Sequence, residues 1–79
     1  MLSGIQLRIL DFIEVRDNPV SQDMLEARFK DEFKESELYY RLEHLRLLGF
    51  IEKMKVGDKH GYPRYNYRLS IKYKKESGK

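Results

Sequence analysis

The stretch LYYRLEHLRLLGFIE, residues 38–52, decides the fold of this 79-residue chain. On a helix, Leu38, Leu42 and Leu45 lie within about 60° of one another, so they form a narrow stripe that faces a core. Gly49 follows this stripe and suits the left-handed backbone position that ends many helices. The stretch therefore predicts a helix that ends at this glycine and leads directly into an extended segment.

The sequence after this helix changes to a period of two residues. From Tyr65 to Tyr73 the odd positions are apolar and the even positions are basic or polar, which is typical of a strand with one buried face. Residues 50–56 are the expected partner strand. Residues 57–63 contain two glycines and one proline, and we expect them to form a long hairpin tip. The inward set of the second strand is Tyr65, Tyr67, Leu69, Ile71 and Tyr73.

Two further helices are predicted before this stretch. Ser3 can cap an amphipathic helix over residues 4–16, and Pro19 separates it from the next element. Ser21 can cap a second, short helix, and Ser36 is the predicted start of the third helix. The expected core residues of the first two helices are Leu2, Ile5, Ile9, Phe12, Ile13, Leu25 and Phe29.

Residues 20–70 resemble the winged helix-turn-helix family. The likeness lies in the helix-to-strand junction of residues 38–52 and in GYPRYNYRLS, residues 61–70, which is similar to the return strand of a wing. With ELYYRL, residues 37–42, the chain most resembles PadR-like transcriptional regulators without their C-terminal dimerisation helix. The resemblance implies an α+β fold, a three-helix winged helix-turn-helix with a C-terminal β-hairpin wing. We expect one domain over residues 1–73 and a disordered basic tail over residues 74–79.

The charge of the chain is divided unevenly along the sequence. Residues 1–50 carry seven Lys/Arg and ten Asp/Glu, a net charge of −3, whereas residues 51–79 carry nine Lys/Arg and three Asp/Glu, a net charge of +6. A basic C-terminal third on a slightly acidic body indicates a segment that contacts a polyanion, although a solvated lysine-rich tail has the same composition.

The resemblance implies that the third helix enters the major groove of DNA and that the hairpin grips the backbone. Glu37 and Glu43 balance Arg41 and Arg46, so this helix is neutral, and we expect the hairpin to supply most of the affinity. Contact with about five phosphates predicts a salt slope near −4 to −5. The face opposite the leucine stripe carries Ser36, Tyr40, Glu43, His44 and Leu47. The candidate DNA-binding residues are Ser36, Tyr39, Tyr40, Arg41 and His44 on the helix and Lys53, Lys55, Lys59, His60, Tyr62, Arg64, Arg68 and Lys72 on the hairpin.

The sequence offers no parts for catalysis. His44 and His60 are the only histidines, they belong to different predicted elements, and the chain has no cysteine. Neither a metal-ligand spacing nor a phosphate-binding glycine loop nor a nucleophile motif is present. We therefore expect no enzyme activity, no metal and no cofactor. The apolar runs are too short to span a membrane, and a cytoplasmic location is expected.

The first functional hypothesis is a small transcriptional regulator that binds double-stranded DNA, sequence-specifically or semi-specifically. A homodimer on a two-fold-related site is expected, with Leu7 and Leu10 as candidate contacts, because a single module of this size binds weakly. The alternative is a winged-helix protein–protein interaction module without direct DNA binding, which the neutral helix and outward Leu47 favour. Binding of RNA or single strands through the tyrosine-bearing hairpin is a third hypothesis.

Overall fold

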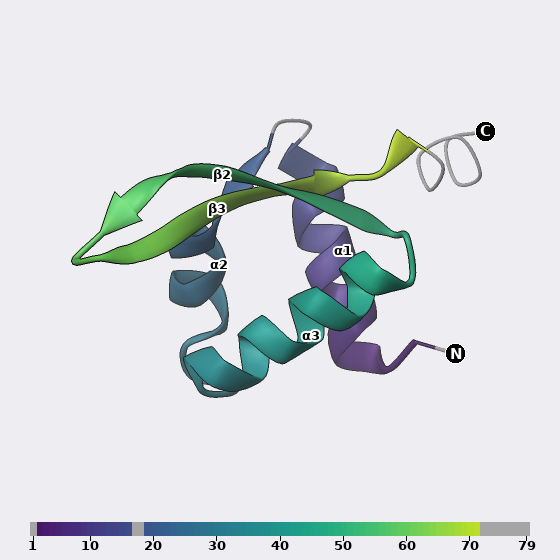
Figure 1. Ribbon diagram of the computed structural model, residues 1–79. Helices are drawn as coiled ribbons and strands as arrows, with labels where there is room; N and C mark the ends of the chain where they lie inside the picture. Colours follow the sequence, from purple (N-terminus) through teal and green to yellow (C-terminus); the bar gives the residue numbers. More distant parts are fainter. Residues whose placement is uncertain (1, 17–18, 72–79) are drawn as a thin grey trace.

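A computed structural model of the chain describes residues 2–16 and 19–71. They form an α+β fold in which three helices cover a small antiparallel sheet of three strands, an arrangement compatible with a winged helix (Figure 1). The α+β prediction is thus confirmed. The elements in chain order are α1 (Gly4–Arg16), β1 (Val20–Ser21), α2 (Gln22–Phe29), α3 (Glu35–Leu47), β2 (Ile51–Lys59) and β3 (Tyr62–Leu69).

The first two helices begin where their capping residues predicted. The Ser3 hydroxyl accepts from the Gln6 backbone N–H, and the Ser3 N–H donates to Gln6 Oε1 at 3.0 Å, which completes a capping box. Ser21 accepts from the Met24 N–H at 3.1 Å at the start of α2. The predicted start of α3 at Ser36 is wrong by one residue. Lys34 is the N-cap, because its N–H donates to the side chain of Glu37 one turn later.

Gly49 ends α3 as predicted, with a φ of 89°. The Phe50 N–H donates to the Leu45 carbonyl, and the Gly49 N–H donates to the Arg46 carbonyl, the two bonds of a Schellman motif. The Gly49 carbonyl in turn accepts from the Ser70 hydroxyl at 2.6 Å. This glycine therefore joins the end of α3 to the chain that leaves the sheet.

The sheet has the order β1-β3-β2, so β3 is its central strand. The pairing of Val20 with Tyr67 forms part of the two-residue contact between β1 and β3. The sequence did not predict β1, because two residues are too few to show an alternating pattern. The strand predicted to continue to Tyr73 ends at Leu69, where its partner β2 begins, and Ile71 is exposed rather than inward. Tyr73 lies outside the described residues.

The hairpin connection is shorter than predicted. Lys59 pairs with Tyr62, so the turn contains only His60 and Gly61, not the whole of residues 57–63. Both turn residues have positive φ, 54° and 82°, as in the type I′ turns that match the twist of a hairpin. One extra residue between Lys55 and Gly57 forms a bulge in β2.

The core lies between α1, α2, α3 and the inner face of the sheet. Tyr67, Ile9, Val20 and Leu45 are completely buried within it. Leu10 is also buried, although the sequence placed it at the flank of α1 as a dimer contact; it is therefore not available to a second copy, whereas Leu7 is exposed as expected. The buried hydrophobic residues are Ile9, Leu10, Ile13, Val20, Leu25, Phe29, Leu38, Leu42, Leu45, Ile51, Tyr67 and Leu69.

Substitution by alanine should change the free energy of unfolding differently at the two glycines that lie at helix ends, Gly49 and Gly4. Gly49→Ala should lower the free energy of unfolding by about 1–2 kcal/mol, because an L side chain is strained at this positive φ even though the space around it is open. Gly4→Ala is the matched control: Gly4 begins α1 without positive φ, and its Cβ would meet nothing. Urea denaturation measures both changes. Equal effects of the two substitutions would contradict the role assigned to Gly49.

Candidate nucleic-acid interface

The β2–β3 hairpin extends past α2, so its tip lies away from the helices (Figure 1). All residues from 55 to 63 are exposed, which includes the predicted contacts Lys55, Lys59, His60 and Tyr62. The tight two-residue turn places Lys59 and Tyr62 opposite each other on the two strands. The tip therefore presents one lysine, one histidine and one tyrosine to solvent on a narrow two-stranded ribbon.

The outer face of α3 carries a second group of predicted contacts. Tyr40 is 73% exposed, and Ser36 is exposed one turn before it. Arg41 and His44 line a shallow hollow of about 250 Å³ together with Glu37 and Tyr40. This face thus offers hydroxyl, guanidinium and imidazole groups, all of which can bond base edges or phosphates.

His44 also contacts Gln6, a residue that was not predicted to belong to the site. Gln6 of α1 is buried, and its Nε2 lies 2.6 Å from His44 Nδ1. Because Gln6 Oε1 accepts from Ser3, the amide nitrogen is the atom that donates to the imidazole. This leaves Nε2 of the neutral imidazole protonated. The spacing of Ser3 and Gln6 is typical of a capping box, which involves Gln6 in the start of α1. No pattern in the sequence indicates its contact with His44 of α3.

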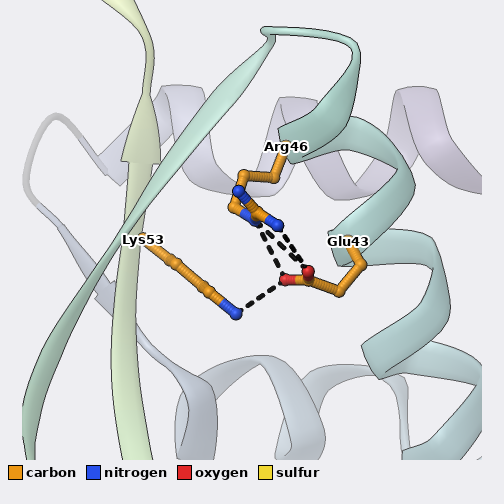
Figure 2. Close-up of polar contacts among 3 residues, drawn as sticks. All are labelled: Glu43, Arg46 and Lys53. Atoms are coloured by element: carbon orange, nitrogen blue, oxygen red, sulfur yellow. Dashed lines mark hydrogen bonds and ion pairs between the residues drawn. The ribbon is translucent and has the colours of Figure 1, made fainter.

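Glu43 lies on the side of α3 that faces the sheet, not on the outer face where the sequence placed it. Its carboxylate accepts from Arg46 Nη2 at 2.8 Å and from Lys53 Nζ at 2.9 Å, as Figure 2 shows. Lys53 also lies over the rings of Tyr65 and Tyr39, at 4.4 Å and 5.5 Å from their centroids. Both predicted contacts Lys53 and Tyr39 are therefore engaged between α3 and the sheet.

This contact network perturbs the acidity of Glu43. Hydrogen bonds from Arg46, and then from Lys53, lower the pKa of Glu43 to about 2 from its usual value of 4.5, against the opposing effect of burial. Only 19% of the Glu43 side chain and 20% of the Lys53 side chain are exposed. Lys53 thus stabilises the junction of α3 with β2, and its ammonium is not a free phosphate ligand.

Arg64 of β3 is bound to α2. Its Nη2 donates to a carboxylate oxygen of Asp23 and to Glu26 Oε1, the latter at 3.2 Å. The side chain of Arg64 is 22% exposed, whereas that of Asp23 is 61% exposed. Arg64, the first of the phosphate contacts predicted along β3, is therefore already bound to two carboxylates.

Two further hairpin cations, Arg68 and Lys55, form solvent-exposed ion pairs. Arg68 donates to Glu52 on the neighbouring strand at 2.9 Å, and Lys55 lies 3.6 Å from Asp58. Exposed pairs of this kind contribute about 0–1 kcal/mol each, so both cations remain able to exchange partners. Lys72 lies outside the described residues.

Carboxylates of α2 and α3 offset the positive charge of the described part of the hairpin. Residues 51–71 carry five basic and two acidic side chains. Three carboxylates from the helices, Glu43 of α3 and Asp23 and Glu26 of α2, form ion pairs with Lys53 and Arg64 of the hairpin. Within the described part of the chain, the cations without an ion pair are Arg16, Lys30, Lys34, Arg41 and Lys59.

Comparisons with known proteins give no relative: no family model, no curated protein and no solved structure matches this chain. Within residues 2–16 and 19–71, no helix has the length and apolar character needed to cross a membrane. The same residues contain no group of three or more His, Cys, Asp or Glu side chains placed to hold a metal ion.

The depressed pKa of Glu43 predicts a specific loss of stability in acid. The folded state holds the ionised carboxylate, so the stabilisation is complete above pH 4.5 and is lost as the pH falls toward 2. The difference in unfolding free energy between the wild type and Glu43→Gln should narrow by about 2 kcal/mol between pH 6 and pH 3. Urea denaturation at a series of pH values measures this change.

Glu14→Gln is the control, because Glu14 is exposed and forms no ion pair with any residue that the structure describes. Its difference from the wild type should change less than that of Glu43→Gln over the same pH range, because the substitution breaks no ion pair between described residues. Parallel profiles of Glu43→Gln and the wild type would contradict the assignment of Glu43 as the link between α3 and β2.

Proposed function

We propose that this protein is a winged helix-turn-helix module that binds double-stranded DNA and acts as a small transcriptional regulator. The element order α1-β1-α2-α3-β2-β3 and the sheet order β1-β3-β2 are compatible with that family. In the proposed complex, α3 enters the major groove and the hairpin contacts the backbone.

One observation carries this proposal: an exposed face of α3 and a projecting hairpin both present polar and basic groups. Arg41 and Tyr40 lie on the first surface, and Lys59 and His60 lie on the second. A helix of this kind fits the width of the major groove, and a two-stranded ribbon can follow the adjacent backbone. The two surfaces together match the two contacts that a winged helix makes.

The contact set is smaller than the one predicted from sequence. Lys53 and Arg64 are engaged with helices, so the cations proposed to meet DNA are Arg41, Lys55, Lys59 and Arg68. Four phosphate contacts correspond to a salt slope of about −3.6 for duplex DNA, less steep than the value expected from the whole basic hairpin. The proposed binding is accordingly modest, and two copies on a two-fold-related site would strengthen it, with Leu7 as the candidate contact between them.

A second candidate function is docking of a protein partner on α3. Leu47 and Tyr40 are each 73% exposed, and they lie on the same outer face of the helix. Apolar and aromatic side chains of this kind are typical of protein interfaces. Binding to random duplex DNA at low salt distinguishes the two functions, because a protein-docking module would show none.

Removal of two proposed contact cations should weaken DNA binding. The double variant Arg41→Ala/Lys59→Ala should raise the dissociation constant for a 20-base-pair duplex by about tenfold or more and reduce the salt slope by about 2, because two phosphate or base contacts are lost. Fluorescence anisotropy over 50–200 mM salt measures both quantities.

Arg16→Ala/Lys30→Ala is the matched control, because these two cations also form no ion pair with a described residue and lie in α1 and after α2, outside the proposed interface. It should change the dissociation constant by less than about threefold. Equal losses in the two double variants, or binding that does not vary with salt, would contradict the proposed interface.

A further inference from the structure

We infer that Asp23 and Glu26 of α2 hold Arg64 away from DNA in the unbound protein, and that transfer of this arginine to a phosphate sets the affinity of the hairpin. The inference rests on the proposed DNA-binding function and adds an intramolecular competitor to it. The competitor is a pair of carboxylates that occupies the same guanidinium that a phosphate would bind.

The geometry of the pair supports this competition. Arg64 Nη2 donates to both Asp23 and Glu26, and Glu26 is further oriented by Gln22 Nε2, which donates to Glu26 Oε2 at 3.2 Å. The planar guanidinium binds carboxylates and phosphates with the same donor arrangement. A phosphate oxygen can therefore replace a carboxylate oxygen without any change in the chemistry of the bond.

Arg64 lies at the base of the exposed part of the hairpin, so the exchange of its partners would occur there. Arg64 pairs with Gly57 across the sheet, beside the bulge. All residues between Lys55 and Pro63 are exposed, and Arg64 is the first residue of β3 after the tip that is partly buried. A DNA backbone that contacts Lys59 at the tip would next meet this arginine along the strand.

The charge balance at this point disfavours DNA in the unbound state. Two carboxylates surround one guanidinium, so the group of three residues carries a net charge of −1. The two carboxylates therefore oppose the approach of a phosphate to the base of the hairpin. The acidic residues of α2 thus lower the affinity that the basic hairpin would otherwise have.

The ion pairs of Arg64 differ from that of Lys53 in the exposure of one carboxylate partner. Lys53 and Glu43 are each about four-fifths buried, and Lys53 also contacts two aromatic rings. Asp23 is mostly exposed, so water and phosphate can reach its pair with Arg64. The pair of Arg64 with Glu26 is about as buried as that of Lys53 with Glu43, because its side chains are 22% and 20% exposed. A pair with an exposed partner contributes only about 0–1 kcal/mol, so Asp23 is the carboxylate that a phosphate oxygen replaces first.

The test compares two variants that remove the same charge. Asp23→Asn/Glu26→Gln should bind a 20-base-pair duplex at least about threefold more tightly than the control Asp11→Asn/Glu14→Gln, and its salt slope should be steeper by about 0.9, the value for one further phosphate. Asp11 and Glu14 are exposed on α1 and form no ion pair with a described residue. Fluorescence anisotropy over 50–200 mM salt gives both values.

The addition of Arg64→Gln to Asp23→Asn/Glu26→Gln should abolish both the gain in affinity and the steeper slope. Circular dichroism establishes that each variant is folded, and Glu26→Gln alone replaces the double variant if that one unfolds. Equal affinities of the two charge-matched variants, or weaker binding by Asp23→Asn/Glu26→Gln, would overturn the inference while the proposed function stands. Absence of duplex binding by the wild type and all variants at 50 mM salt would overturn both.

Discussion

The rest of the structure depends on the burial of Tyr67 in the central strand. This side chain is completely buried, and its residue pairs with Val20 on β1 and with Lys53 on β2. Its hydroxyl has no hydrogen-bond partner among the described residues, and burial raises the pKa of this group. The large apolar area of a buried tyrosine outweighs one unpaired hydroxyl, so the residue holds the register of all three strands.

That register determines which charges meet. Val20 pairs with Tyr67, and α2 begins directly after β1. The first turn of α2 therefore lies next to β3, and Asp23 lies beside Arg64. The pairing of Tyr67 with Lys53 places this lysine opposite Glu43 of α3. Lys53 and Arg64 are thus held in ion pairs with the helices, because the burial of Tyr67 sets the register of their strands. The surface that we propose for DNA consists of the outer face of α3 and the outer part of the hairpin.

Local signals in the sequence were sufficient for most of the fold. Ser3, Ser21 and Gly49 mark helix ends through hydrogen bonds or backbone angles that involve only the next few residues, and these predictions were confirmed. The hairpin turn and β1 were not predicted correctly. Strand β1 has only two residues, which are too few to show a periodic pattern. The turn places His60 at a positive φ, which is uncommon for residues other than glycine, so the sequence did not single out this position.

The sequence by itself determined the three helices, the alternating face of β3 and the excess of positive charge after residue 50. It also determined that Tyr40 and Leu47 lie opposite the leucine stripe of α3, because helical periodicity is a local property. Only the tertiary structure decided which cations are free. The partners of Arg64 are 41 and 38 residues away, and such pairs follow from how elements pack rather than from spacing along the chain.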